Sequence, residues 1–171
     1  MGAVRSSNVQ SGAGTKQAWT MRGSHNLKRR QRIRAGLVFL AAGQGISGIW
    51  ALAAPRSFYD DFPGAGLGWV VAIPKYSEHL VRDVGAFNLA FAFLFLWVAA
   101  GLDRTAVRGA LLAWLVFAIP HLVFHLFHLD ALSSNSKIIQ LIALGITVLL
   151  PIALLVSSQK LEQRRTSMLL R

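Results

Sequence analysis

Four long apolar runs without a single charged residue constrain this chain more than any other feature. They cover residues 35–54, 84–102, 109–129 and 138–158, and each holds between 19 and 21 residues. At a rise of 1.5 Å per residue, each run is long enough to cross a hydrocarbon core about 30 Å thick. Hydrophobic residues make up 54% of the chain, and the mean hydropathy is +0.48, which is too apolar for an ordinary soluble domain of this length.

These runs predict an all-α integral membrane four-helix bundle in one domain, residues 35–158. We expect its helices at about 35–54, 78–102, 106–129 and 138–158. The basic segments 1–34 and 159–171 flank this domain, and the first of them is expected to be disordered because Gly, Ser, Gln and Asn are frequent in it. Met21 is followed by a basic cluster, so it is a second candidate for the start of translation beside Met1.

The distribution of charge predicts the orientation. The two flanking segments and the 102–108 turn together carry 14 of the 18 Lys and Arg residues. The opposite side carries four basic residues and five acids. Because basic residues gather on the cytoplasmic side, we expect a multi-pass protein of the plasma (inner) membrane with both termini in the cytoplasm.

The net charge of +11 has the same explanation. The excess lies beside the membrane, where it attracts anionic lipid, and no platform of aromatic and basic residues accompanies it. We therefore expect the lipid bilayer, and no nucleic acid, as a partner. The chain has no cysteine, which excludes disulfides, Cys-based metal sites and thiol catalysis.

A stripe of three histidines is the main sequence lead to a functional site. His121, His125 and His128 follow each other at i, i+4 and i+7 near the end of the third run. On a helix they fall within about 60° of one another. Ionisable side chains within a membrane span are costly, so they usually face protein, a cavity or a cofactor.

A second polar group opens the second helix. Because neighbouring helices run in opposite directions, we expect it at the same membrane level as the histidine stripe, with His121 or His125 within about 8 Å of Glu78, His79 or Asp83. The group and its supporting residues are Glu78, His79, Arg82 and Asp83, with Asn88 deeper in the helix and Asp130 after the third helix.

Three chemistries fit this group of residues, and none is favoured by spacing alone. Two of the stripe histidines, with His79, Glu78 or Asp83, would bind zinc or copper. His79 facing His121 or His125 would provide two axial ligands for haem. Histidines that titrate near neutral pH would suit a proton relay or a quinone head group. In the structural alternative these side chains only lock helices together, and the protein is an assembly subunit of a membrane complex. No nucleophile motif indicates an enzyme.

The segment between the first two helices is expected to contain a short interfacial helix over 56–63, after Pro55 ends the first helix. It is either a lid that caps the bundle or a loop that gates a site, and its candidate residues are Tyr59, Asp60, Asp61 and Trp69. In the fourth run, Pro151 is expected to kink the helix, with Thr147 bonding the backbone that the proline frees. In the first run, Ala41 and Gly45 are expected to allow close helix packing.

The chain resembles the DoxX-like group of small four-helix bacterial membrane proteins over residues 35–157. The resemblance rests on the apolar first helix, the proline-started outer loop, Arg82-Asp83-x-Gly85 at the second helix and the histidine-bearing third helix. It implies a four-helix bundle and a link to respiratory or redox chemistry, but it supplies no catalytic residues. The resulting hypothesis is a binding or redox-accessory protein, either a homo-oligomer or a subunit of a membrane complex.

Overall fold

The computed structural model describes residues 10–72, 75–159 and 161, and this part of the chain contains α-helices, one 3₁₀ turn and no strand. The elements are α1 (Gln10–Ala53), α2 (Pro55–Asp61), α3 (Glu78–Gly101), α4 (Arg104–Leu126), the 3₁₀ turn Leu129–Ala131 and α5 (Ser134–Ser158). The prediction of an all-α four-helix bundle is confirmed, and α2 is the short helix expected after Pro55.

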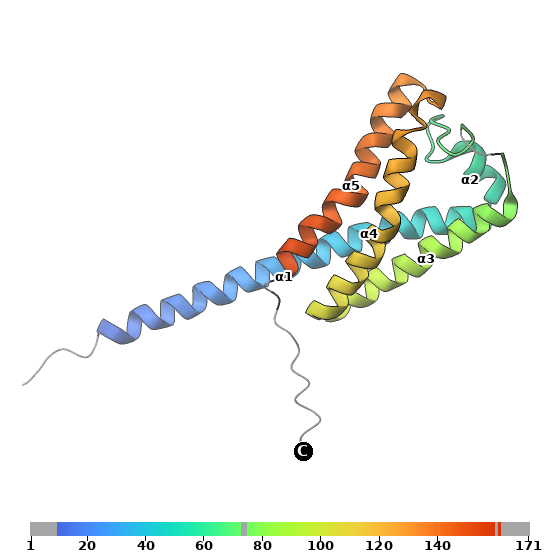
Figure 1. Ribbon diagram of the computed structural model, residues 1–171. Helices are drawn as coiled ribbons and strands as arrows, with labels where there is room; N and C mark the ends of the chain where they lie inside the picture. Colours follow the sequence, from blue (N-terminus) through green and yellow to red (C-terminus); the bar gives the residue numbers. More distant parts are fainter. Residues whose placement is uncertain (1–9, 73–74, 160, 162–171) are drawn as a thin grey trace, which may run out of the picture.

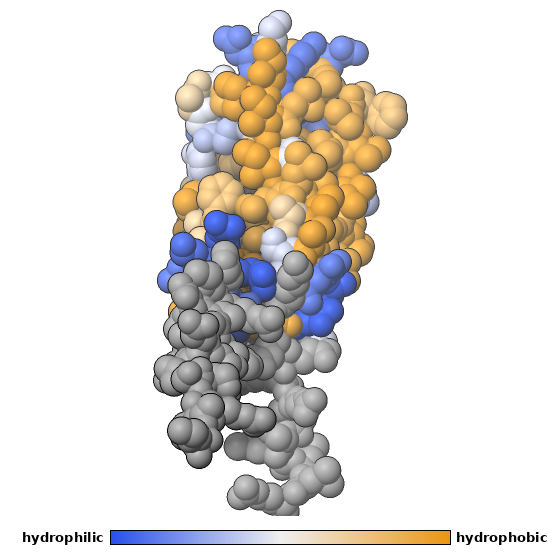
Figure 2. All heavy atoms as spheres, turned by 90° about the vertical axis from the view of Figure 1, so that its left-hand side faces the viewer, coloured by the Kyte–Doolittle hydropathy of each residue, from blue (hydrophilic) through white to orange (hydrophobic). Residues whose placement is uncertain are grey.

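Four helices are long and apolar enough to cross a membrane, namely Asn26–Ala53 of α1, together with α3, α4 and α5. Their bounds lie within a few residues of the predicted ranges, except at the start of α1. Figure 2 shows the expected surface: a broad hydrophobic band separates hydrophilic residues at its two ends.

Residues 10–34, within the segment expected to be disordered, belong to α1 in the structure. Lys, Arg, Gln and Ala are good helix formers, and a helix that is already nucleated in a span extends at little cost. Residues 1–9, and most of the basic tail 159–171, lie outside the described residues.

The four spans form two antiparallel pairs, α1 with α3 and α4 with α5, and the second pair crosses the first (Figure 1). We call the end that contains α2, the loop 62–72 and the turn 127–133 the loop end. The opposite end, with the turn between α3 and α4, is the charged end. From that turn α3 and α4 diverge toward the loop end, where α2 packs on α1 and α3.

Two glycines bring the backbones of α1 and α3 into close contact. A Cβ atom on Gly48 would lie 2.9 Å from the carbonyl oxygen of Gly85, and a Cβ atom on Gly85 would lie 3.0 Å from the backbone nitrogen of Leu52. Small residues allow such backbone contact between membrane helices. The predicted pair has a lesser role: Ala41 is buried, and a Cβ atom on Gly45 would make only an ordinary contact of 3.8 Å with Ala92.

The α4–α5 pair is joined by a hydrogen bond from the indole of Trp114. Its Nε1 donates to the carbonyl oxygen of Thr147 over 2.9 Å. Thr147 lies four residues before Pro151, whose missing N–H leaves this carbonyl without its helical partner. The expectation that the Thr147 side chain fills this role is wrong, because its hydroxyl bonds to the Leu144 carbonyl instead.

Basic side chains bond to a carbonyl near the C-terminal end of each span. Carbonyls in the last turn of a helix lack the backbone N–H that follows one turn later, and the helix dipole favours positive charge beside them. Three of the donors are arginines on other helices, and the fourth is a histidine in the turn that follows its helix. The pairs are Arg82 with Leu52 of α1, Arg34 with Ala99 of α3, His128 with Phe124 of α4 and Arg108 with Leu155 of α5.

Candidate functional site

The three histidines of the stripe do not share one environment. His121 is half-buried, stacks on the ring of Phe117 at 5.0 Å and meets His125 edge to face at 4.6 Å. His128 is exposed, and its Nδ1 lies 2.8 Å from the Phe124 carbonyl oxygen. His121 and His125 therefore form a pair directed into the protein, whereas His128 caps the end of α4.

The polar group at the start of α3 satisfies itself locally. His79 lies 3.3 Å from Asp83, one turn along α3, and the His79 side chain is 83% exposed. Arg82 forms an ion pair with Glu78 at 2.8 Å and also bonds to α1. Asn88 is buried within α3. Asp130 lies 3.8 Å from Lys137 at the loop end.

The expected convergence of these two groups on one metal ion is not found. Within residues 10–72 and 75–159, no three His, Cys, Asp or Glu side chains lie close enough together to hold a metal. The reason is the course of the helices, since the start of α3 and the end of α4 lie far apart in Figure 1. The histidine pair and the α3 carboxylates thus belong to different parts of the loop end.

The register of α4 against α5 identifies what the histidine pair faces. Trp114 and Thr147 are bonded, so residues equally far from them along the antiparallel helices lie at the same level. His121 and Gln140 are each seven residues away, and His125 and Ser136 are each eleven residues away. Seven and eleven residues are close to two and three helical turns, so these residues also share the face of the bonded pair. Gln140 and Ser136 are only 1% and 3% exposed.

The loop 62–72 closes this region from the side of α2. The hydroxyl of Ser136 donates to the carbonyl oxygen of Leu67 over 3.1 Å, which joins the loop to the start of α5. Trp69 is buried two residues further on, and its ring packs edge to face against Phe62 at 6.0 Å.

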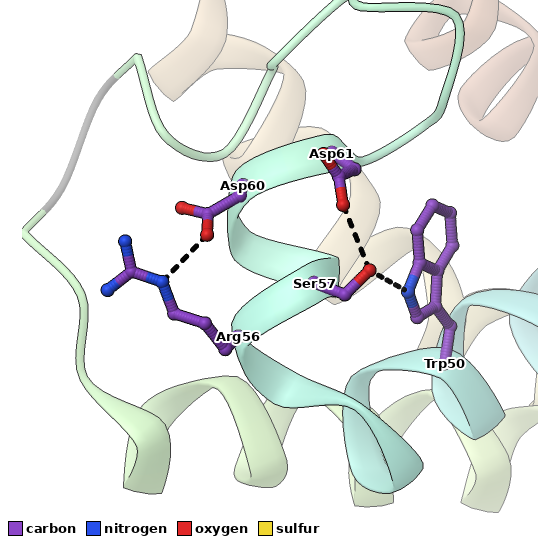
Figure 3. A network of polar contacts seen from close by, with 5 residues as sticks. All are labelled: Trp50, Arg56, Ser57, Asp60 and Asp61. Carbon is purple, nitrogen blue, oxygen red and sulfur yellow. Dashed lines mark hydrogen bonds and ion pairs between the residues drawn. The ribbon is translucent and has the colours of Figure 1, made fainter.

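Contacts around α2 hold the start of the loop 62–72 in place. Trp50 Nε1 donates to the hydroxyl of Ser57, which donates to Asp61, while Arg56 and Asp60 form an ion pair of 2.7 Å on the other side of α2 (Figure 3).

Aromatic contacts hold α2 against the residues that precede α3. The buried ring of Tyr59 packs against Tyr76 at 5.2 Å, and the Arg56 guanidinium lies 5.0 Å from the Tyr76 ring. Hydrogen bonding to Asp60, and then its charge, raises the pKa of Arg56. Tyr59, Asp60 and Asp61 thus hold α2 in place, and Trp69, in the loop that follows, has a buried polar atom without a partner among the described residues.

Three buried polar atoms, each on an element that reaches the loop end, have no hydrogen-bond partner among the described residues. They are Nε1 of Trp69, Nδ1 of His125 and Oε1 of Gln140, from the loop, α4 and α5. A buried polar atom without a partner costs about 1–3 kcal/mol, so native proteins rarely keep several without a use. We call His121, His125, Ser136, Gln140 and Trp69 the histidine–glutamine site.

This site can exchange hydrogen bonds with a neutral ligand. The Trp69 indole only donates, the Gln140 carbonyl oxygen only accepts, and the His125 nitrogen does either according to its tautomer. The ring of His121 adds a flat aromatic wall together with Phe117. Gln140 was missed as a site residue, although a glutamine within an otherwise apolar span is itself a signal of polar contact.

Comparison of the chain with family models, with curated proteins and with solved structures gives no match. Function is therefore argued from the histidine–glutamine site itself.

Proposed function

We propose that this membrane protein binds the head group of a quinone or quinol in the histidine–glutamine site and acts as a redox-accessory protein. The observation that carries the proposal is the set of three partnerless buried atoms on Trp69, His125 and Gln140. A quinone carbonyl accepts from N–H donors such as Trp69, and a quinol hydroxyl also donates to an acceptor such as Gln140. Such a ligand uses all three atoms without bringing a charge into the span.

The surroundings favour a quinone over the other ligands considered. A zinc or copper site needs about four ligands, and His121 and His125 come without a carboxylate beside them. A haem held between His79 and one of these histidines needs His79 directed inward, but its side chain is 83% exposed and lies beside Asp83. Four of the five site residues, all except Trp69, also lie in the apolar spans α4 and α5, from which a lipid-soluble ligand can enter.

The resemblance to DoxX-like proteins supports the redox role only in general terms. Two residues of the shared motif have a structural use here, because Arg82 caps α1 and Gly85 packs on α1. The charge distribution supports the plasma membrane, with the charged end and both termini in the cytoplasm and the histidine–glutamine site near the outer leaflet.

A binding titration on the full chain in mild detergent tests the proposal. A short-chain ubiquinone analogue and its quinol are added while tryptophan fluorescence is followed, since Trp69 belongs to the site and Trp114 lies two turns from His121. We expect saturable quenching, and a Kd raised at least tenfold in His125→Leu, equivalent to about 1.4 kcal/mol. His79→Gln and His128→Gln are matched controls that remove a histidine outside the site and should bind as the wild type does.

Two results would overturn the proposal. Equal, non-saturating quenching in the wild type and His125→Leu would exclude a quinone at this site. Stoichiometric zinc or copper in the purified protein, lost in His121→Leu and His125→Leu, would assign the histidine pair to a metal. The assembly-subunit alternative predicts no quenching at all and a lower unfolding midpoint in His125→Leu.

A further inference from the structure

A hollow on the first turns of α4, at the charged end, is separate from the histidine–glutamine site. It has a volume of about 380 Å³ and is lined by Arg104, Thr105, Arg108, Gly109 and Leu112. Arg104, Arg108 and Leu112 follow each other at intervals of four residues along α4, with Thr105 and Gly109 beside them, so the hollow follows the helix from its start into the span.

The head of the hollow is positively charged and offers free donors. Arg104 has no hydrogen bond or ion pair within the described parts of the chain, and Arg108 uses only Nη1, in a 3.4 Å contact with the Leu155 carbonyl. The neighbouring Asp103 is engaged as the N-cap of α4, where it accepts from the backbone nitrogen of Ala106. Two guanidinium groups and the Thr105 hydroxyl suit the oxygens of a phosphate, which arginine binds through paired N–H groups.

The other end of the hollow is apolar and open. A Cβ atom on Gly109 would meet nothing within 4 Å, Leu112 is 51% exposed, and Val116, one turn further, is 76% exposed. From Arg104 to Val116 the same face of α4 passes from charge to apolar surface over about 18 Å. A free phosphate would use only the first part of this face, whereas a lipid would use all of it.

We propose that this hollow binds an anionic phospholipid, with its phosphate on Arg104, Thr105 and Arg108 and an acyl chain along Gly109 and Leu112. Basic residues beside a membrane attract anionic lipid in general. The proposal is more specific, since it assigns one bound lipid to one face of α4.

Lipid-dependent stability of the full chain in mild detergent is the test, with phosphatidylglycerol, phosphatidylcholine and inorganic phosphate as probes. We expect phosphatidylglycerol to raise the unfolding midpoint saturably, and native mass spectrometry to detect one retained lipid. Arg104→Gln should weaken this lipid at least tenfold, and it breaks no contact within the described fold. Arg32→Gln removes the same charge from an exposed position of α1 and should leave lipid binding unchanged.

A second variant separates a built site from general charge attraction. Gly109→Leu keeps every charge and puts an apolar side chain into the hollow, at a position where a Cβ atom meets nothing within 4 Å, so it should also lose the retained lipid. The proposal is overturned if Gly109→Leu and Arg104→Gln bind phosphatidylglycerol as the wild type does. It is also overturned if inorganic phosphate stabilises the protein as well as the lipid does, because the hollow would then be a simple anion site.

Discussion

Trp114 on α4 supplies the hydrogen bond that Pro151 removes from α5. The indole Nε1 of Trp114 donates over 2.9 Å to the carbonyl oxygen of Thr147, the acceptor four residues before the proline. Water is not at hand within a span, so a carbonyl freed by proline needs such a partner. The same bond fixes the register that sets His121 level with Gln140.

A double-mutant cycle tests this relationship. Trp114→Phe should destabilise the protein by about 1–3 kcal/mol more than the loss of ring volume alone, because the Thr147 carbonyl loses its partner. In a Pro151→Ala background the helix supplies its own N–H, so the excess should disappear. Unfolding in detergent measures the coupling. An equal cost of Trp114→Phe in both backgrounds would show that the bond contributes nothing.

The contact of Gly48 with Gly85 predicts a position-dependent effect of alanine on α1. Gly48→Ala should cost about 1–3 kcal/mol, because the new methyl group meets the backbone of Gly85 and overpacks the α1–α3 contact. Gly43→Ala is the matched control: a Cβ atom there meets nothing within 4 Å, and removing a helical glycine should stabilise by about 0.5–1 kcal/mol. Thermal unfolding measures both variants. If their unfolding midpoints shifted in the same direction, the close packing of Gly48 on Gly85 would not explain the effect.

The sequence predicted the spans well because hydrophobicity and length alone define them. The start of α1 was missed because composition indicates disorder in 10–34, whereas helix continuity depends on the adjacent span. Ser77 caps the start of α3 by accepting from the backbone nitrogen of Leu80. This cap and the Glu78–Arg82 pair were accessible to sequence reasoning because each depends on contacts within about one turn.

The histidine–glutamine site was only partly accessible from sequence. The spacing of His121 and His125 indicated a pair, but the choice between α3 and α5 as the facing helix depends on helix rotation and crossing. The spacing of His128 would make it a third member of the histidine stripe. It lies just after the end of α4, however, where the last carbonyls of the helix need hydrogen-bond donors. Gln140 and Ser136 carry no motif, and their importance follows from the register that Trp114 sets.

The orientation of the chain is open to a direct test because it contains no cysteine. Asn135→Cys lies at the loop end and Thr105→Cys at the charged end, and both positions are exposed. A membrane-impermeant maleimide added to intact cells should label Asn135→Cys, whereas Thr105→Cys should react only after the cells are permeabilised. The reverse pattern would place the histidine–glutamine site toward the cytoplasm and contradict the positive-inside argument.

Stability and binding should change in opposite directions when Gln140 is replaced. Its Oε1 is buried without a partner, so Gln140→Met, which keeps the side-chain volume, should raise the free energy of unfolding of the ligand-free protein by about 1 kcal/mol. The same change removes the acceptor proposed for a quinol and should weaken quinol binding at least tenfold. Chemical unfolding and the fluorescence titration measure the two effects on one preparation.

The sign of the stability change separates the two functional readings of the site. A binding site keeps a partnerless polar group at a cost to the empty protein, so its removal stabilises. A glutamine that locks helices together makes its bonds within the fold, so its removal destabilises. Gln140→Met with lower stability and unchanged quinol binding would therefore support the assembly-subunit alternative. Ser136→Ala offers the contrast: its hydroxyl is bonded to Leu67, so its loss should lower stability.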